Sequence, residues 1–207
     1  MPVMLSFSNS IFKYGSKSLN VQLNQSLCLP VSTQLQCDTG AMPFTIATVT
    51  AFHLDFWIYL YNVSTPGYIF YISNAAGSVF CMNLGSTVAA TSGTQQLQWE
   101  ISSNGTSYNV ALAQPTVNSI TLNSWNYISI SYDGDTYSLN INGVNDLSFT
   151  GAPMATTGTH IFFNWANNQA FYLDEVIFTP YLRATNTGSP FPLISNSIVG
   201  SPYALLL

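Results

Sequence analysis

The segment from Asn164 to Asn168 places one tryptophan among several amide side chains. An indole ring can stack on the apolar face of a sugar, while the amides of Asn164, Asn167 and Asn168 hydrogen-bond its hydroxyl groups. The alternative is that Trp165 packs over the edge of the hydrophobic core, as loop aromatic residues often do. We predict Asn164, Trp165, Asn167 and Asn168 as a ligand-binding group. Four tyrosines could extend that surface or face the core instead: Tyr59, Tyr61, Tyr68 and Tyr71.

The carboxylates do not form a recognisable catalytic pair. Asp174 and Glu175 are adjacent in a predicted strand, so their side chains point to opposite faces of a sheet. Retaining hydrolysis of a glycosidic bond needs two carboxyl groups about 5 Å apart. Asp55, Glu100 or Glu175 could supply the second group, but with so few candidates a hydrolase is the least favoured function. We therefore predict no catalytic residue.

The other candidate catalytic and metal-binding groups are isolated in the sequence. His53 and His160 each stand alone in a predicted strand, where a structural histidine is more common than a base or a metal ligand. Serines are too frequent to exclude a Ser-His-Asp arrangement, although no Gly-x-Ser-x-Gly motif occurs. Oxygen ligands near two turns could bind calcium, namely Asp133, Asp135 and residues 142–146. Turn chemistry explains the same residues, so no metal site is predicted.

Cysteines and glycosylation motifs offer possible sites of covalent modification. Cys28 and Cys37 are nine positions apart around a loop that contains Pro30, and they could form a disulfide that leaves Cys81 as a buried apolar residue. Three buried thiols explain the same sequence equally well. Asn-x-Ser/Thr motifs would permit N-glycosylation at Asn24, Asn62 and Asn104.

Charged residues are scarce throughout the chain. Three Lys and Arg and eight Asp and Glu make up 5% of the 207 residues and give a net charge of −5, whereas roughly 25% is usual. Nucleic-acid binding needs clustered basic residues, so we expect none. The most apolar window, Ile46 to Val63, contains His53 and Asp55 and alternates like a strand, so we expect no membrane span. Hydroxyl and amide groups must keep the surface soluble, which favours an extracellular or virion location.

Short β-branched and aromatic runs alternate with polar turns from end to end, which predicts a β-sandwich or barrel. Asp133-Gly134 and Asn142-Gly143 separate three such runs and predict a three-strand meander, and Asn104-Gly105 predicts another hairpin. No repeat or linker divides the chain, so we expect one domain over 1–184 and an irregular C-terminal arm over 185–207. The predicted strands are 18–23, 51–61, 68–73, 78–84, 97–102, 107–113, 125–132, 136–141, 144–149, 159–164 and 170–179.

Four segments, in this order, resemble the concanavalin A-like jelly rolls of the laminin G-like type, especially those of phage and other viral proteins. They are FKYGSKSLNV at 12–21, FHLDFWIYL at 52–60, SWNYISISYDGDTYSLNINGV at 124–144 and FYLDEVIFTPYLR at 171–183. The resemblance implies two antiparallel sheets packed face to face, with ligands bound at a rim or on the concave sheet. It also implies a structural role for Asp174. The Glu-x-Asp-x-x-Glu strand of related glucan hydrolases is absent.

These observations favour a non-enzymatic virion structural protein in a tail, nozzle, spike or capsid surface. Its partners would be other virion proteins, copies of itself and a cell-surface glycan. An exposed apolar chain end is unusual, so we predict Leu205, Leu206 and Leu207 as assembly contacts. The alternative is a carbohydrate-binding module without a cofactor, and a glycan hydrolase is less favoured.

The scarcity of carboxylates predicts that the fold persists in strong acid. Acid unfolds proteins mainly by protonating carboxylates whose native contacts lower their pKa, and this chain has eight. Far-UV circular dichroism should keep its β signal from neutral pH down to about pH 2. A cooperative loss of that signal between about pH 5 and 3, where ordinary carboxylates titrate, would contradict this expectation.

Overall fold

The computed structural model describes an all-β protein. It describes the backbone and side chains of residues 51–61, 67–74, 81–86, 93–155, 160–163 and 171–173. It also describes the backbone of short strands at 7–8, 18–19, 27–29, 35–38, 174–179 and 205–206. Over these residues every regular element is a strand, which confirms the predicted fold class. None of the described residues forms a helix long and apolar enough to cross a membrane.

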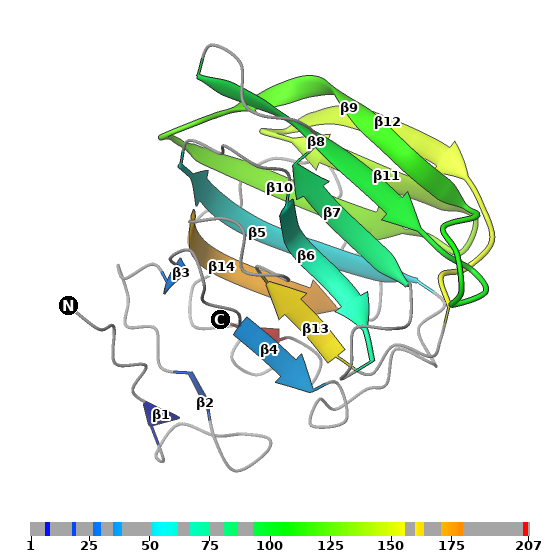
Figure 1. Cartoon of the computed structure of the whole chain (residues 1–207), viewed down its shortest axis with the longest axis horizontal. Coiled ribbons are helices and arrows are strands. Elements are labelled where there is room, and N and C mark those ends of the chain that lie inside the picture. The colour runs from blue at the N-terminus through cyan, green and yellow to red at the C-terminus, as the bar shows by residue number, and fades with distance from the viewer. Residues whose placement is uncertain are drawn as a thin grey trace.

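Two antiparallel sheets form the two layers of a sandwich (Figure 1). One sheet has six strands in the order β4-β13-β6-β7-β8-β9 within the described part of the chain. Its strands are β4 (Leu35–Asp38), β13 (His160–Phe163), β6 (Gly67–Ser73), β7 (Met82–Ser86), β8 (Thr94–Ile101) and β9 (Ala111–Thr121).

The other sheet has seven described strands in the order β12-β11-β10-β5-β14-β15, and β3 also pairs with β14. Its strands are β12 (Val144–Thr150), β11 (Thr136–Ile141), β10 (Trp125–Tyr132), β5 (Phe52–Leu60), β14 (Phe171–Thr179), β15 (Leu205–Leu206) and β3 (Leu27–Leu29). A separate pair is formed by β1 (Phe7–Ser8) and β2 (Ser18–Leu19).

The meander predicted from two turn dipeptides is confirmed, since β10 pairs with β11 and β11 with β12. Asn142 and Gly143 have φ values of 51° and 84°, and a two-residue type I′ turn requires positive φ at both positions. At the other end of β11, Asp133 Oδ1 accepts the backbone N–H groups of Thr136 and Asp135 at 2.7 and 2.9 Å. Both turns are therefore built by local polar contacts.

Those two N–H donors, from Thr136 and Asp135, lower the pKa of Asp133. A lowered pKa means that Asp133 stabilises the fold above its ordinary pKa and that this contribution is lost as the pH falls through the lowered value. Because the carboxylate is exposed, solvent screens the contribution and it is small. This carboxylate is therefore a weak source of acid sensitivity.

The largest difference from the sequence prediction concerns β9. The pattern predicts a strand over 107–113, whereas residues 102–110 form a loop and the strand runs over Ala111–Thr121. The sequence does not predict this strand because it contains Pro115, and proline cannot donate a hydrogen bond between strands. It is tolerated since β9 lies at the edge of its sheet, with β8 as its one partner there. The predicted hairpin itself is confirmed by the pairing of β8 with β9.

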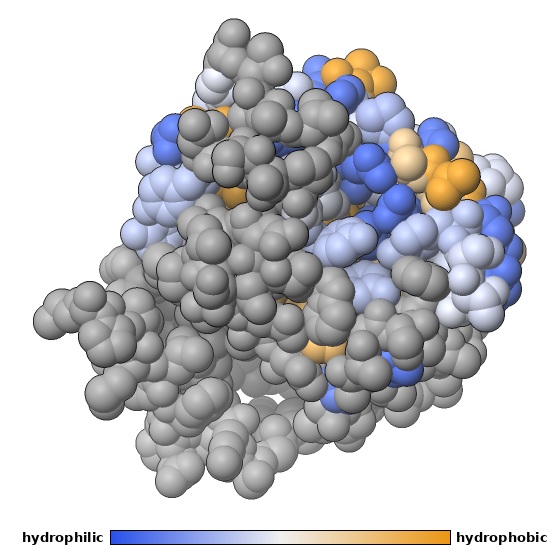
Figure 2. Space-filling view, viewed as in Figure 1, coloured by the Kyte–Doolittle hydropathy of each residue, from blue (hydrophilic) through white to orange (hydrophobic). Residues whose placement is uncertain are grey.

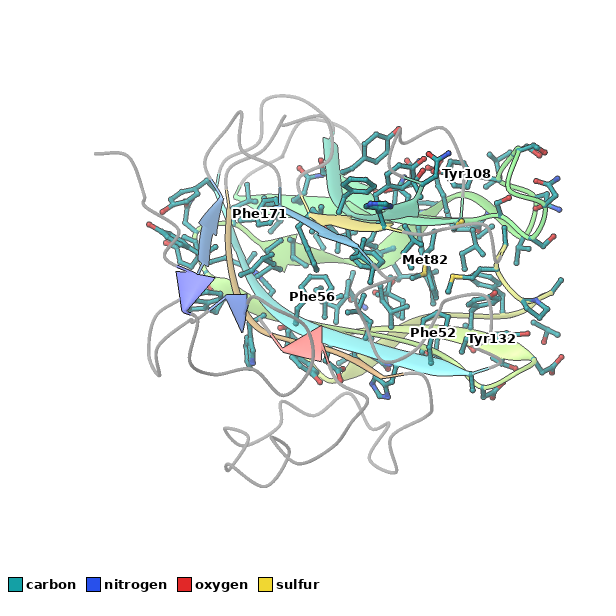
Figure 3. The ribbon with its side chains drawn as sticks, turned by 90° about the horizontal axis from the view of Figure 1, so that it is seen from below. Phe52, Phe56, Met82, Tyr108, Tyr132 and Phe171 are labelled. Carbon is teal, nitrogen blue, oxygen red and sulfur yellow. The ribbon has the colours of Figure 1, made fainter. Side chains whose placement is uncertain are left out.

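Alternation along the strands fills the space between the sheets with apolar side chains. Figure 3 shows Phe52, Phe56, Met82 and Phe171 between the two layers. Cys81 is buried, as both interpretations of the cysteines predict. From β5 and β8 the interior receives Phe52, Leu54, Phe56, Ile58 and Leu60, and Leu97, Trp99 and Ile101. Burial of each large side chain stabilises the fold by about 1.5–3 kcal/mol, so these two strands contribute much of the core.

The seven-stranded sheet also carries a buried polar cluster on the face that points away from this core. His53 Nε2 lies 2.9 Å from Ser129 Oγ and 3.1 Å from Asp55 Oδ1. Tyr127 donates its hydroxyl proton to Asp55 Oδ1 at 2.7 Å. All four side chains are buried. Buried polar groups are costly unless they are hydrogen-bonded, so these contacts hold β5 and β10 together in one register.

Loss of the carboxylate in this cluster should destabilise the protein strongly. Asp55→Ala removes the acceptor of Tyr127 and the anion beside His53, and should lower the free energy of unfolding by about 3–5 kcal/mol. Ser129→Ala leaves the contact between Asp55 and Tyr127 in place and should cost about 1 kcal/mol. Urea unfolding followed by circular dichroism measures both values. An Asp55→Ala protein as stable as the parent would contradict a structural role for the cluster.

Candidate functional site

The outer face of the six-stranded sheet brings aromatic, amide and carboxylate side chains together. Residues directly paired in an antiparallel sheet point to the same face. One row across β13, β6, β7 and β8 therefore contains Phe162, Tyr71, Asn83 and Glu100. The next row across β6, β7 and β8 contains Tyr68, Gly85 and Gln98. In the view of Figure 1, β6, β7 and β8 lie on the side nearest the viewer. Figure 2 has the same view and shows hydrophilic residues over much of its coloured surface.

A bulge in β6 adjusts the spacing of the two tyrosines on this face. Its pairing with β7 shifts between Tyr68 and Phe70. An extra residue at a bulge changes which positions share a face. As a result Tyr68 and Tyr71, which are three positions apart, stack with ring centroids 5.7 Å apart and an interplanar angle of 19°. Tyr68 is 36% exposed and Tyr71 is buried beneath it.

Glu100 is held in the middle of the face by two amides. Asn83 Nδ2 donates to Glu100 Oε2 at 2.6 Å, and Gln98 Nε2 donates to Glu100 Oε1 at 3.1 Å. A carboxylate oxygen accepts more than one hydrogen bond, so both oxygens can also accept protons from a ligand. Asn83 is 2% exposed, and in the described part of the chain its Oδ1 accepts no hydrogen bond. Glu100 therefore gives the site two acceptor oxygens for a ligand, whereas Asn83 Oδ1 is buried.

Gly85 stands between Tyr68 and Gln98 in the second row and leaves no side chain there. A Cβ at this position would lie 2.8 Å from the backbone oxygen of Gly67. Real Cβ atoms essentially never approach a backbone atom so closely, so the approach of β6 to β7 requires glycine. Tyr68 consequently has no neighbouring side chain from β7 in its own row.

Tyr108 adds a third phenol from the loop between β8 and β9, and Figure 3 places it on the outer side of its layer. Its hydroxyl group is hydrogen-bonded to Tyr71. Burial raises the pKa of Tyr108 and of Tyr71. Both phenols are therefore neutral at physiological pH, and each can donate and accept hydrogen bonds.

The described residues of this face do not provide a pair of catalytic carboxylates. Glu100 is the one carboxylate whose side chain is described there, and the backbone of Asp38 lies four strands away in β4. Asp55 is on the opposite sheet, and Asp133 and Asp135 belong to the turn before β11. Hydrolysis of a glycosidic bond needs two carboxyl groups on either side of that bond. The arrangement therefore suits binding better than hydrolysis.

A serine, a histidine and an aspartate do lie together in the structure, namely Ser129, His53 and Asp55. Asp55 and Ser129 contact the same nitrogen of His53, Nε2. A catalytic triad uses one ring nitrogen for the serine and the other for the aspartate. All three residues are also buried. The preferred reading of His53 as a structural histidine is therefore supported by its contacts.

The four tyrosines considered as one sugar-binding surface are divided between two faces. Tyr68 and Tyr71 belong to the site described above. Tyr59 and Tyr61 lie on the outer face of the other sheet, where their ring centroids are 5.4 Å apart. There Tyr59 also contacts Trp125 and Tyr172 at centroid distances of 5.7 and 6.0 Å. The four residues therefore cannot contact one ligand.

The residues considered for calcium also fail to converge. Asp133 and Asp135 lie at one end of β11, and residues 142–146 begin at its other end. A strand of this length separates its ends by roughly 20 Å. The described residues contain no group of three potential metal ligands of the His, Cys, Asp or Glu type. Asp146 instead accepts the backbone N–H groups of Val117 and Asn118, both at 2.7 Å, and so links β12 to β9.

Several predicted sites lie wholly or partly outside the described residues and stay predictions. This applies to the ligand-binding group Asn164, Trp165, Asn167 and Asn168, to the glycosylation sites Asn24 and Asn62, and to Leu207. Asn104 is exposed in the loop after β8, and its Oδ1 accepts the N–H groups of Thr106 and Ser107.

For the cysteine pair and the assembly contacts, the structure gives the backbone position. Cys28 is in β3 and Cys37 is in β4, which belong to different sheets. Leu205 and Leu206 form β15 and pair with Phe178 and Ile177 of β14 in the same chain. The C-terminal segment, expected to be irregular, therefore adds a short strand to the seven-stranded sheet.

Sequence reasoning missed Asn83, Gln98 and Tyr108 as members of a site and considered Glu100 only as a hydrolase carboxylate. One signal was present, because Gln96, Gln98 and Glu100 occupy every second position of β8 and therefore share a face. Asn83 gave no such signal, since its partnership with Glu100 depends on the pairing of β7 with β8.

Solved structures of other proteins share this fold. The structure described as HCR/D-Sa-GBL1/C has a TM-score of 0.58 and 14% identity, covering 88% of this chain and 44% of that one. A heptameric SAP-like pentraxin from Limulus polyphemus has a TM-score of 0.54 and 14% identity, covering 81% of this chain and 76% of that one. The binding domain of Botulinum Neurotoxin DC in complex with SialylT has a TM-score of 0.52 and 15% identity, covering 82% and 42%.

Identities this low show a shared fold and nothing further, and the chain spans less than half the length of two of these three structures. No curated protein matches the sequence. The sequence model of the Laminin_G_3 family, described as the concanavalin A-like lectin/glucanases superfamily, matches residues 34–180, which is more than half of the chain. The predicted resemblance to concanavalin A-like domains of the laminin G-like type is thereby confirmed over these residues, and the chain belongs to the concanavalin A-like lectin/glucanases superfamily.

Proposed function

We propose that this chain is a non-enzymatic glycan-binding domain and that the outer face of its six-stranded sheet is the binding surface. The observation that carries the proposal is the position of Glu100, fixed by Asn83 and Gln98 on the same face of the sheet as the exposed ring of Tyr68. A tyrosine ring stacks on the apolar face of a sugar, and a fixed carboxylate accepts protons from its hydroxyl groups. Fixing these groups before binding reduces the entropy lost when a ligand binds.

The absence of enzymatic activity is part of this proposal. It is supported by Glu100 being the one carboxylate whose side chain is described on the face, since hydrolysis of a glycosidic bond needs two. A superfamily with both lectins and glucanases allows either function, so the residues of the site have to decide between them.

Removal of the exposed ring should weaken sugar binding while leaving the fold intact. Tyr68→Ala deletes the stacking surface, and we expect a rise of about 5- to 150-fold in the dissociation constant, since stacking contributes roughly 1–3 kcal/mol per ring by analogy with bases. Glycan-array screening followed by calorimetry measures this. Tyr61→Ala is the matched control, because Tyr61 is also partly exposed but lies on the other sheet. Equal loss in both variants, or loss in Tyr61→Ala alone, would contradict the assignment of the face.

A second candidate function is that of a structural protein of a virion surface, with the glycan-binding face turned toward a host cell. This proposal is supported by exposed apolar side chains on the two edge strands at one side of the sandwich. Leu112 and Val117 on β9 and Val144 on β12 are all more than half exposed. In Figure 2 small hydrophobic groups lie along the rim on which β9 runs in Figure 1. Edge strands with exposed apolar residues pair readily with other chains.

Assembly through these edges should be visible as a defined multimer of the purified chain. Light scattering at about pH 3 and about pH 7 should give a mass above that of one chain at one or both values, because the few carboxylates leave little charge to repel copies. The double variant Leu112→Gln and Val144→Gln should reduce that mass without adding charge. A monomer at both pH values would contradict the structural proposal and leave glycan binding untouched.

A further inference from the structure

We infer that the ligand of this face carries no negative charge, and is therefore a neutral glycan or a glycan of amino sugars. The inference rests on the proposed function and adds the chemical class of the ligand. It also assigns Glu100 as the residue that excludes acidic sugars.

The first step is the distribution of basic residues. The three of them are Lys13, Lys17 and Arg183, and the sequence from 18 to 182 contains neither Lys nor Arg. All strands of the six-stranded sheet, from β4 to β13, lie in that stretch. Proteins hold the carboxylate or sulfate groups of acidic sugars with Arg and Lys side chains. No strand of the proposed binding sheet can supply such a side chain.

The second step concerns backbone donors, which bind anions at other protein sites. β6, β7 and β8 are interior strands with a hydrogen-bonded partner on each side. Their N–H groups are used in the ladders of the sheet. An acidic ligand lying over these strands would therefore find no free row of backbone donors.

The third step is the hydrogen-bonding character of the face. Glu100 is partly exposed and presents two acceptor oxygens, both held in place by amide donors. A carboxylate or sulfate has only acceptors, whereas sugar hydroxyl groups and protonated amines donate. A ligand rich in donors therefore complements this face and an anionic one does not.

The fourth step is the charge of Glu100 itself, which is partly buried and held by two amides. Repulsion between like charges is stronger at a partly buried site than in water. An acidic sugar placed over Tyr68 would approach this carboxylate, while an amino sugar would be attracted to it.

The test compares ligands that differ only in charge. The full chain is screened against an array that contains neutral, acidic and amino glycans of several linkages. Binding is then measured by calorimetry for one matched set, such as cellohexaose, its C6-oxidised uronate and a chitosan hexamer. We expect neutral or amino members to bind and acidic members of the same linkage to bind at least about tenfold more weakly. Neutral ligands should bind equally at low and high salt, because screening acts on charges.

The variant Glu100→Gln separates local charge from other effects. Asn83 can rotate its amide and offer Oδ1 to the new side-chain NH₂ group, so the variant keeps a partner at this position. Binding of acidic members should improve several-fold over the parent, and binding of neutral members should change less. Asp135→Asn removes the same charge at the distant β10–β11 turn and should leave the ratio unchanged. Thermal unfolding verifies that both variants fold.

The two proposals fail in different ways. Acidic glycans that bind the unmodified chain as tightly as their neutral counterparts would overturn the charge inference and leave glycan binding standing. An array on which no glycan of any class binds would overturn the proposed function, and the inference with it. If Glu100→Gln fails to fold, the comparison of matched ligands on the unmodified chain still decides.

Discussion

Burial of one face of each sheet against the other is the interaction on which the rest of the structure depends. On β8 the side chains of Leu97, Trp99 and Ile101 fill the interior, so Gln98 and Glu100 between them must face outward. A slip of one residue in the pairing of β8 would exchange these two sets and bury a carboxylate in the core. The position of the candidate binding residues is therefore a consequence of core packing.

The near absence of basic residues changes how the carboxylates are stabilised. In the described residues they are bound by neutral donors, such as the backbone N–H groups at Asp133 and Asp146 and the phenol at Asp55. His53 also contacts the carboxylate of Asp55. Hydrogen bonds from neutral donors are less sensitive to salt than ion pairs between charged side chains. This sandwich is held by apolar packing and neutral hydrogen bonds, which also gives its outer faces their uncharged character.

Both outer faces of the sandwich carry aromatic clusters, but their surroundings differ. On the seven-stranded sheet Tyr59 contacts both Trp125 and Tyr172, and a buried His53 and Asp55 cluster lies on the same face. On the six-stranded sheet Tyr68 shares its face with Glu100 and Gln98, which are both partly exposed. Ligand binding requires accessible polar groups that orient a ligand as well as apolar surface, which is why the six-stranded sheet is the better candidate.

Local sequence was sufficient for the strands whose ends are marked by turn chemistry. Trp125–Tyr132 and Thr136–Ile141 were predicted with the bounds that the structure has, because Asp-Gly and Asn-Gly turns and strict alternation act over neighbouring residues. The all-β class followed from the same patterns, whereas the superfamily came from the resemblance of four segments to known members. Local patterns failed for β9 because it contains Pro115, and a proline argues against a strand unless the strand lies at the edge of a sheet.

The candidate site depended on the tertiary structure because its members come from different strands. Glu100 meets Asn83 through the pairing of β8 with β7, and a bulge in β6 brings Tyr68 and Tyr71 onto one face. Sheet membership also separated Tyr59 and Tyr61 from Tyr68 and Tyr71, which look equivalent in the sequence. The sequence by itself determined strand type, charge and apolar content, since these depend on residue identity and short-range alternation. Which side chains meet was decided by strand order and register, because hydrogen bonding between distant strands sets both.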